Sequence, residues 1–509
     1  MSQPKTMTIR LHPDDNVVVA AVPLQAGDKV DQEGIICRNL IPQGHKIAAK
    51  VIQEGEIIRK YGQIIGVASR DIHAGEHVHT QNMQMVKYDR EYSFGKDACP
   101  TVFDLDKDQA FFQGIRRADG RVATRNYIGV IASVSCSSSV ARFIADRFDA
   151  GSLADFPNVD GIVSVVHGSG CGIADHGDGI EYLQRTLTGW ARHPNFAGLL
   201  LVGHGCEINQ IDGLAEKMGL EPCPTFQMFD VQSAGGTKRA IQSGVEAIKE
   251  MLPEANRIKR QPIPASNLIV GLECGGSDAL SGITANPALG VASDLLVRNG
   301  GTVILSETTE IYGAEQLLVR RAVNEEIAGK LIERVQWWEE NAKHHGIELD
   351  NNPSPGNKAG GLTTILEKSL GAVAKSGSTN LVEVYRFAQP VISKGLVFMD
   401  TPGYDMVSVT GMIAGGANMI CFTTGRGSVF GSKPVPTIKL VSNSRTFHAM
   451  EDDMDINCGR IIDGEAGVEE IGHEIFQSIL DTASGKKTKS ELLNFGDNEF
   501  VPWHMGAIL

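Results

Sequence analysis

The sequence predicts an α/β protein with a small all-β module at its N-terminus. Residues 7–82 are short apolar segments separated by turn sequences such as "PQGH" and "QEGE", a pattern typical of short strands. From residue 116 onward, continuous apolar strands alternate with helical segments, which predicts a parallel sheet covered on both faces. The chain has 509 residues, enough for two or three domains.

We therefore expect three parts along the chain. They are an all-β module over residues 1–82, a polar linker over 83–115 and a large α/β region over 116–509, which can divide into two subdomains near 255–265. Within the large region, the apolar periodicity predicts one long amphipathic helix over residues 314–344. The prolines and glycines of 351–361 predict a loop.

Composition limits the classes of partner. Apolar residues make up 42% and charged residues 21% of the chain, as in ordinary globular proteins. A net charge of −14 disfavours nucleic acid as a partner. The N-terminus lacks the apolar core of a signal peptide, and no apolar run approaches the length of about 20 residues that spans a bilayer. We expect a cytoplasmic protein without membrane contact, in which the nine cysteines are thiols, metal ligands or catalysts rather than disulfides.

Four of those cysteines follow predicted strands directly: Cys136, Cys171, Cys206 and Cys274. Ligands of open α/β sheets bind beyond the carboxyl ends of the strands, so the four sulfurs are predicted to face one pocket and to hold a metal. Thiolates suit iron, as a single ion or a cluster, or zinc. The alternative is that each cysteine is a small buried apolar residue.

Two glycine-rich segments argue against a dinucleotide cofactor. "GSGCGI" (168–173) and "GHGCEI" (203–208) have isoleucine where the third glycine of the fingerprint belongs. A third segment, "GRG" at 425–427, follows a predicted strand and carries Arg426. Arginine matches carboxylate geometry with two parallel hydrogen bonds, so this loop is interpreted as a carboxylate cradle or, alternatively, as a plain turn with a surface arginine.

Several motifs together resemble the altronate and galactarate dehydratase family. They are "GLECGGSDALSGITANP", "NPSPGNKAGG", "FTTGRG", "GCE" at 205–207 and "GHK" at 44–46. The resemblance implies an N-terminal SAF domain of the β-clip fold. It also implies that the protein removes water from a sugar acid to give a 2-keto-3-deoxy product. It implies a dependence on iron, as Fe²⁺ or an iron–sulfur cluster, with Mn²⁺ as the alternative, and the family also has cysteine at the four positions named above.

Dehydration of a 2,3-dihydroxy acid requires a base and an electrophile that stabilises negative charge on oxygen. His167 is favoured as the acid–base group because it ends a predicted strand near Cys171. His45 is expected to be carried to the site by the β-module, which would act as a lid. The predicted catalytic residues are His45, Lys46, His167 and Lys358.

Hydroxyl and carboxylate groups of the substrate need polar partners. The predicted substrate-binding residues are Ser277, Asp278, Asn286, Asn357, Thr424 and Arg426. Lys358 could instead neutralise the substrate carboxylate, and Asp278 could instead cap a helix. His77 and His79 alternate along a strand and so share a face; we interpret them as exposed strand histidines in preference to a metal-binding arm.

The substrate is predicted to be an aldonate such as altronate, because "GEHVHTQN" (75–82) and "YGAEQLL" (312–318) resemble altronate enzymes. "RAVNEE" (321–326) and "ASGKK" (483–487) instead resemble galactarate enzymes. The alternatives are therefore galactarate, another β-substituted 2-hydroxy acid such as sulfolactate, or a sensor that binds a sugar acid without turnover. A homodimer is the expected assembly.

Overall fold

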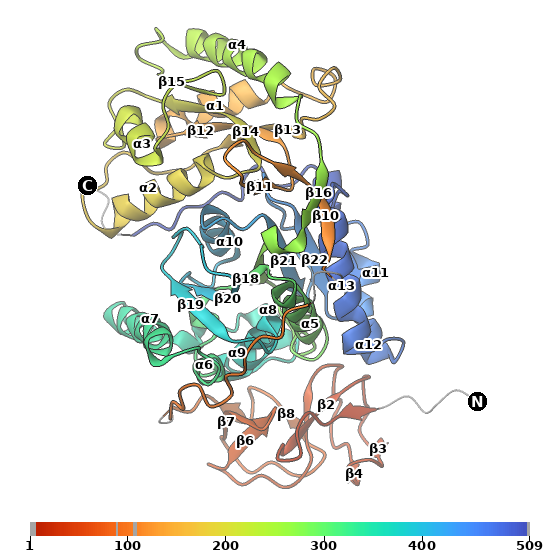
Figure 1. Cartoon of the computed structure of the whole chain (residues 1–509). Coiled ribbons are helices and arrows are strands. Elements are labelled where there is room, and N and C mark those ends of the chain that lie inside the picture. The colour runs from red at the N-terminus through yellow and green to blue at the C-terminus, as the bar shows by residue number, and fades with distance from the viewer. Residues whose placement is uncertain (1–6, 88–89, 105–108, 506–509) are drawn as a thin grey trace.

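The structure confirms the predicted α/β fold with an N-terminal all-β module. It is a computed structural model that describes residues 7–87, 90–104 and 109–505. Figure 1 shows the β-module at the bottom, a seven-stranded sheet with its helices in the middle and a four-stranded sheet with its helices at the top.

The N-terminal module consists of two small antiparallel sheets, ordered β1-β2-β5-β8 and β6-β7-β9, and the hairpin β3-β4. Its short strands follow from tight turns that need glycine: at Gly75, where φ is +80°, a Cβ would lie 1.9 Å from the carbonyl oxygen of Ile36. The strands are β1 (Thr8–Ile9), β2 (Val17–Ala20), β3 (Lys29–Val30), β4 (Ile35–Ile36), β5 (Lys46–Ala48), β6 (Ile57–Lys60), β7 (Gln63–Ala68), β8 (His77–Val78) and β9 (Met83–Gln84).

The segment after β9 runs along the middle unit. Arg90 forms an ion pair with Glu315 at 2.7 Å, and Asp97 pairs with Arg320 at 2.5 Å. The predicted linker extends too far, because its residues 111–115 belong to a strand, β10 (Phe111–Arg116). This strand pairs antiparallel with β11 (Val122–Ala123) and β16 (Gln261–Pro264), which gives its backbone groups the partners that a loop would lack.

The upper unit contains a parallel sheet ordered β13-β12-β14-β15. Its strands are apolar throughout because helices cover both faces, α1 and α4 on one and α2 and α3 on the other. The elements are β12 (Tyr127–Ala132), β13 (Gly161–Val165), β14 (Phe196–Gly203), β15 (Phe226–Asp230), α1 (Ser138–Ala145), α2 (Asp178–Ala191), α3 (Ile211–Met218) and α4 (Thr237–Ala255).

The middle unit contains a parallel sheet ordered β19-β20-β18-β17-β21-β22-β23. Its strands are β17 (Ile269–Cys274), β18 (Thr302–Leu305), β19 (Leu381–Tyr385), β20 (Gly395–Met399), β21 (Met419–Thr424), β22 (Thr437–Val441) and β23 (Ile456–Asn457). Its helices are α5 (Ala285–Arg298), α6 (Glu315–Val319), α7 (Glu325–His344), α8 (Pro355–Ala359), α9 (Ile365–Val373), α10 (Asp405–Ala414), α11 (Ser444–Ala449), α12 (Arg460–Asp463), α13 (Val468–Ala483) and α14 (Lys489–Leu492).

The two parallel sheets are joined by packed helices. Helix α2 of the upper unit packs on α10 of the middle unit within one apolar cluster, and Trp190 donates a hydrogen bond to the carbonyl oxygen of Thr410 at 3.0 Å. Helices α5 and α13 pack together in the apolar cluster of the opposite face of the large sheet. No helix within the described ranges combines the length and the apolar character that a membrane span requires.

Two predictions about local structure are wrong. The expected helix over 314–344 is two helices, α6 and α7, because Ala322 forms a bridge with Leu381 and Asn324 then caps α7 by accepting from the Ile327 amide at 2.9 Å. The expected loop over 351–361 contains the short helix α8, which begins with a capping box between Ser354 and Asn357.

Candidate active site

Four segments that are distant in sequence meet between the carboxyl edge of the large sheet and the β-module. They are residues 44–46, 275–282, 357–361 and 425–427. Lys46 Nζ donates to the carbonyl oxygen of Gly361 at 2.8 Å, and the Arg426 amide donates to that of Gly276 at 2.8 Å. Strands β17 and β21 are parallel neighbours in which Cys274 lies opposite Thr423. The loops that follow them must therefore emerge side by side.

These segments border a cavity of about 560 Å³ between the module and the large sheet. Its lining includes Gln43, His45, Asp278, Gly360, Arg426 and Arg445. A cleft of this size between two structural units, with a few convergent polar groups, is the usual form of a small-molecule site.

Asp278 is the buried acid of this cavity. One carboxylate oxygen accepts from the amide of Ser281 and from the hydroxyl of Ser442, both at 2.8 Å, and the other accepts from Asn443 at 3.2 Å. Asp278 does not cap α5, which begins later, at Ala285. Burial raises the pKa of Asp278 even though these hydrogen bonds favour the carboxylate.

Two arginines also line the cavity, Arg426 after β21 and Arg445 after β22. Both are exposed, and among the described residues neither guanidinium has a hydrogen bond or an ion pair. Their donors are therefore available to an anion that enters. Sequence reasoning found Arg426 and missed Arg445, although the sequence places "SNSR" directly after an apolar strand.

Three histidines of the β-module converge beside this cavity. His45 precedes β5, and His77 and His79 come from the paired strand β8 and the residue after it. His45 Nδ1 lies 3.0 Å from His77 Nε2, and the ring centroids of His45 and His79 are 4.9 Å apart. Our interpretation of His77 and His79 as exposed strand histidines is wrong, because both are partly buried and face His45.

This histidine cluster fits a divalent transition metal. One ligand nitrogen from each ring lies within 4.8 Å of the others. Burial, followed by the neighbouring positive charges, lowers the pKa of His77 to about 4 and of His79 to about 3, so both rings are neutral ligands at pH 7. His79 Nδ1 is buried without a hydrogen-bond partner in the described part of the chain, and His45 Nε2 is oriented by the carbonyl oxygen of Ala359 at 3.3 Å.

Lys46 anchors the module rather than facing the cavity. Its Nζ lies 2.8 Å from Glu367, which also binds Lys60 at 2.9 Å, and all three side chains are buried. Burial lowers the pKa of Lys46 to about 8, against the attraction of Glu367. Lys46, predicted to be catalytic, thus belongs to a buried ion triad between the β-module and the large sheet. The sequence could not reveal this triad, because Lys60 and Glu367 belong to no recognisable motif.

The structure does not bring Cys274 to the other three predicted cysteine ligands. Cys274 ends β17 in the large sheet, whereas Cys136, Cys171 and Cys206 follow β12, β13 and β14 of the upper sheet. Among the described residues, each cluster of three potential ligand atoms within 4.8 Å contains at most one cysteine. The prediction of a single four-thiol pocket is wrong, because the chain changes sheet before the fourth strand.

Cys274 instead joins a buried charge cluster. Its sulfur lies 3.4 Å from Glu307 and 3.6 Å from Glu310. Lys375 binds Glu307 at 2.9 Å and Lys368 binds Glu310 at 2.6 Å. Burial and then the charge of Glu307 raise the pKa of the Cys274 thiol well above its usual value, which favours the protonated thiol.

Two further acids complete this cluster, Glu273 and Asp405. Burial followed by repulsion from Glu307 raises the pKa of Glu273 well above its ordinary value and that of Asp405 to about 7. One oxygen each of Glu273 and Glu307 is buried without a partner among the described residues. Lys375 and Lys368 already pair with Glu307 and Glu310 in this cluster. The histidine cluster is the better metal site.

The remaining predicted substrate residues are buried near the cavity floor. Asn357 stabilises the fold, since its side-chain Nδ2 donates to the carbonyl oxygen of Ser277 at 2.8 Å. The Thr424 hydroxyl accepts from the amide of Gly427 at 3.1 Å. In contrast, Ser277 Oγ and Asn286 Oδ1 are buried and have no hydrogen-bond partner within the described ranges, and both residues line a small internal cavity next to the site. Lys358, on α8, is partly buried and does not line either cavity.

His167 is a structural residue of the upper sheet. Its Nε2 lies 3.0 Å from the carbonyl oxygen of Ala132, and its Nδ1 accepts from the Ser169 amide at 3.2 Å. Both ring nitrogens are therefore engaged, and burial lowers the pKa of His167 to about 4. The prediction that His167 is the acid–base group is wrong, because it follows a strand of the other sheet.

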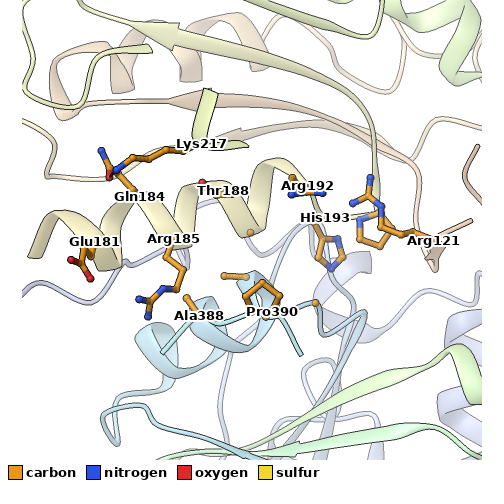
Figure 2. Close-up of a pocket in the computed structure, with 15 residues that line it drawn as sticks. Arg121, Glu181, Gln184, Arg185, Thr188, Arg192, His193, Lys217, Ala388 and Pro390 are labelled. Atoms are coloured by element: carbon orange, nitrogen blue, oxygen red, sulfur yellow. Dashed lines mark hydrogen bonds between the residues drawn. The ribbon is translucent and has the colours of Figure 1, made fainter. Parts of the chain in front are cut away.

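A second cavity, of about 500 Å³, lies between α2 and the segments 388–390 and 414–416 of the middle unit (Figure 2). Its rim carries Arg121, Arg185, Arg192 and Lys217. The one histidine in its lining, His193, is buried with both ring nitrogens hydrogen-bonded, to the carbonyl oxygen of Ala417 and the amide of Asn195. The lining also carries the exposed carboxylate of Glu181, but the four converging segments described above border the other cavity, so the chemistry is better placed at the module interface.

Comparison with known proteins identifies the family. Three family models match in order along the chain: the altronate/galactarate dehydratase SAF domain over residues 6–86, the second domain of D-galactarate dehydratase/altronate hydrolase over 114–256, and the C-terminal D-galactarate/altronate dehydratase model over 265–508. The altronate dehydratase of Bacillus subtilis is 34% identical over 97% of both chains. This chain belongs to the galactarate/altronate dehydratase family.

Other relatives of the family show how its chemistry varies. The galactarate dehydratase of Escherichia coli is 38% identical over 95% of this chain and 94% of its own. The β subunit of a (2R)-sulfolactate sulfo-lyase from Chromohalobacter salexigens is 31% identical over 77% of this chain and 96% of its own. The four segments that border the cavity at the β-module lie within four of the five motifs that carry the family resemblance, and the fifth, "GCE" at 205–207, follows β14 of the upper sheet.

Proposed function

We propose that this chain is a hydro-lyase that dehydrates a sugar acid, an aldonate such as altronate, to a 2-keto-3-deoxy acid. The observation that carries the proposal is the convergence of four family motifs on one cavity, which is lined by two arginines without partners among the described residues and by His45 of the histidine cluster. The near full-length similarity to an altronate dehydratase supports the same reaction. A homodimer in the cytoplasm stays a prediction from the sequence.

In this proposal the two arginines bind the substrate and Asp278 removes its proton. Arg426 and Arg445 bind the carboxylate of the substrate, because their donors have no partner among the residues that the structure describes. Asp278 accepts the proton from the carbon beside that carboxylate, and its raised pKa makes it a stronger base than an ordinary aspartate. The proton leaves with the hydroxyl of the next carbon as water, and the resulting enol becomes the ketone.

The histidine cluster would hold the metal that this chemistry needs. We assign Fe²⁺, or alternatively Mn²⁺, to His45, His77 and His79, since imidazole nitrogens suit these ions. The bound ion supplies a Lewis acid that stabilises negative charge on the substrate oxygens. The β-module that carries the histidines also covers the cavity, so it excludes water while substrate is bound.

Anaerobic purification with iron, followed by detection of the 2-keto product from altronate, galactarate and sulfolactate, tests the proposal. We expect altronate turnover that falls at least about 100-fold in Asp278→Asn and in His79→Ala. His73→Ala is the matched control, because His73 is an exposed histidine of the same module. Binding of altronate without turnover in the iron-loaded wild type would contradict the proposal and favour a sensor.

A dicarboxylate substrate such as galactarate is the second candidate. The observation that favours it is the presence of two arginines, one for each carboxylate. Arg445→Met separates the two: the variant should lose galactarate turnover more than altronate turnover if the arginines bind different carboxylates. Sulfolactate cleavage is the third candidate, supported by the similarity to the sulfo-lyase β subunit.

A further inference from the structure

The second cavity, between the upper and middle units, is bordered by one face of α2. Five residues of this helix and its C-terminal cap line the cavity: Glu181, Gln184, Arg185, Thr188 and Arg192. Successive members are three, one, three and four positions apart, which places them on the same side of a helix with 3.6 residues per turn. Figure 2 shows all five along the cavity. The buried residues of α2 lie on its opposite side, so this face is the one open to a ligand.

Small residues keep the cavity open. Gly189 of α2 packs closely on the end of α10, since a Cβ there would lie 2.2 Å from the carbonyl oxygen of Ala414. Gly415 and Gly416 follow without side chains, and a Cβ on Gly416 would have its nearest neighbour, Ile269, at 3.8 Å. The close contact of the two units therefore ends beside a space of about 500 Å³, which is within the usual size of a small-molecule site.

The side chains around this space are mainly basic. The charged side chains of the lining are four cations and one acid: Arg121, Arg185, Arg192, Lys217 and Glu181. The whole chain, by contrast, has a net charge of −14. Arg121 forms an ion pair with Asp119, which leaves three cations and the Glu181 carboxylate around the space. A concave surface of positive charge on an acidic protein favours an anion as its ligand.

The cationic groups lie toward the two ends of the cavity. Figure 2 shows Arg185 and Lys217 toward one end and Arg192 and Arg121 toward the other. Arg185 and Arg192 are seven residues apart in the sequence, which corresponds to about 10.5 Å along a helix axis. A ligand that contacts both ends must therefore be elongated.

Arg185 and Arg192 have N–H donors available for such a ligand. The Arg192 guanidinium has no hydrogen bond or ion pair in the part of the chain that the structure describes. Arg185 donates one hydrogen bond, to the carbonyl oxygen of Phe387 at 3.0 Å, and its guanidinium carbon lies 5.4 Å from the ring centroid of Tyr182. These contacts orient Arg185 and leave further donors for a carboxylate or another anionic group.

We propose that this cavity binds an elongated organic anion with an acidic group at each end of an apolar body, such as a long-chain α,ω-dicarboxylate. Arg185 binds one acidic group and Arg192 binds the other. The body packs between them against Ala388 and Pro390. A sugar acid fits less well, because Thr188 supplies the one side-chain hydroxyl of the described lining. The site is separate from the cavity at the β-module and goes beyond the proposed dehydration.

The experiment is isothermal titration calorimetry of the full chain with two probes of equal length, suberate with two carboxylates and octanoate with one. We expect suberate to bind at least about tenfold more tightly than octanoate, because octanoate reaches only one of the two arginines. Arg185→Gln and Arg192→Gln should each weaken suberate binding at least about tenfold. Arg147→Gln, the matched control, should leave the affinity unchanged, because Arg147 is an exposed arginine of the same unit outside the cavity.

Further variants separate this cavity from the one at the β-module. Arg445→Met should bind suberate as the wild type does, and Thr188→Phe should weaken binding by filling the cavity without a change of charge. Urea unfolding checks that each variant folds. A loss of affinity in Arg445→Met but not in Arg192→Gln would overturn the proposal. Octanoate binding as tightly as suberate, or no heat of binding from suberate at about 10 mM, would overturn it as well.

Discussion

The two parallel sheets place cysteines at the same topological position but in opposite surroundings. At the edge of the upper sheet, Cys136, Cys171 and Cys206 are exposed after the strands β12, β13 and β14. At the edge of the large sheet, Cys274 is buried between Glu307 and Glu310, whose charges two lysines balance. The position at a strand end brings a side chain to a site, whereas burial and charge decide what chemistry it can perform.

The largest expected effect is a loss of stability at the edge of the large sheet, where the charge cluster around Cys274 is buried. Lys375→Met removes the partner of Glu307 and leaves a carboxylate buried without compensation, so the free energy of unfolding should fall by about 3–5 kcal/mol. Urea unfolding measures this loss. The double variant Lys375→Met/Glu307→Gln should recover part of it, and a double variant no more stable than the single one would show that charge compensation is not what Lys375 provides.

The second largest effect is expected in the reactivity of the thiols at the edges of the two sheets. In metal-free protein at pH 8, iodoacetamide should modify Cys136, Cys171 and Cys206 at least about 100-fold faster than Cys274, because burial and neighbouring carboxylates keep the Cys274 thiol protonated. Mass spectrometry of the labelled peptides gives the rates. Equal labelling of Cys274 in the folded chain would mean that the large-sheet edge opens to solvent.

Acid should destabilise the fold through two histidines of the upper unit. Burial lowers the pKa of His167 and of His193 to about 4, from an ordinary value of 6.5. Below pH 6.5 the unfolded chain binds protons that the folded chain does not, so each histidine reduces stability by about 1.4 kcal/mol per pH unit down to about pH 4. The midpoints of urea unfolding between pH 6.5 and about pH 4 measure this loss of stability. In His193→Gln the pH dependence should be shallower by one histidine's contribution.

The smallest effect is expected on a helix of the upper unit, away from the cysteine loops. Gly213 lies within α3 with nothing within 4 Å of an added Cβ, so Gly213→Ala should stabilise the protein by about 0.5–1 kcal/mol. Gly170→Ala is the contrasting variant, since its Cβ would meet the carbonyl oxygen of Ser133 and its φ is positive. Thermal unfolding of both variants gives the comparison, and a stabilising Gly170→Ala would contradict the close packing of the loops.

Local sequence patterns predicted the fold class and many parts of the site. Turn glycines and short apolar runs determined the β-module, and alternation of apolar strands with helices determined the parallel sheets. The motifs around His45, Asp278 and Arg426 identified segments that the structure brings together at one cavity. These features depend on residue types within a few positions of each other, which a sequence displays directly.

Only the tertiary structure decided which strand ends share an edge. Cys274 follows a strand just as Cys206 does, yet the chain passes through β16 into a second sheet between them. His77 and His79 became candidate ligands because β5 and β8 pair and bring His45 beside them. Strand order, sheet membership and burial arise from contacts between residues far apart in the chain, so no local pattern could reveal them.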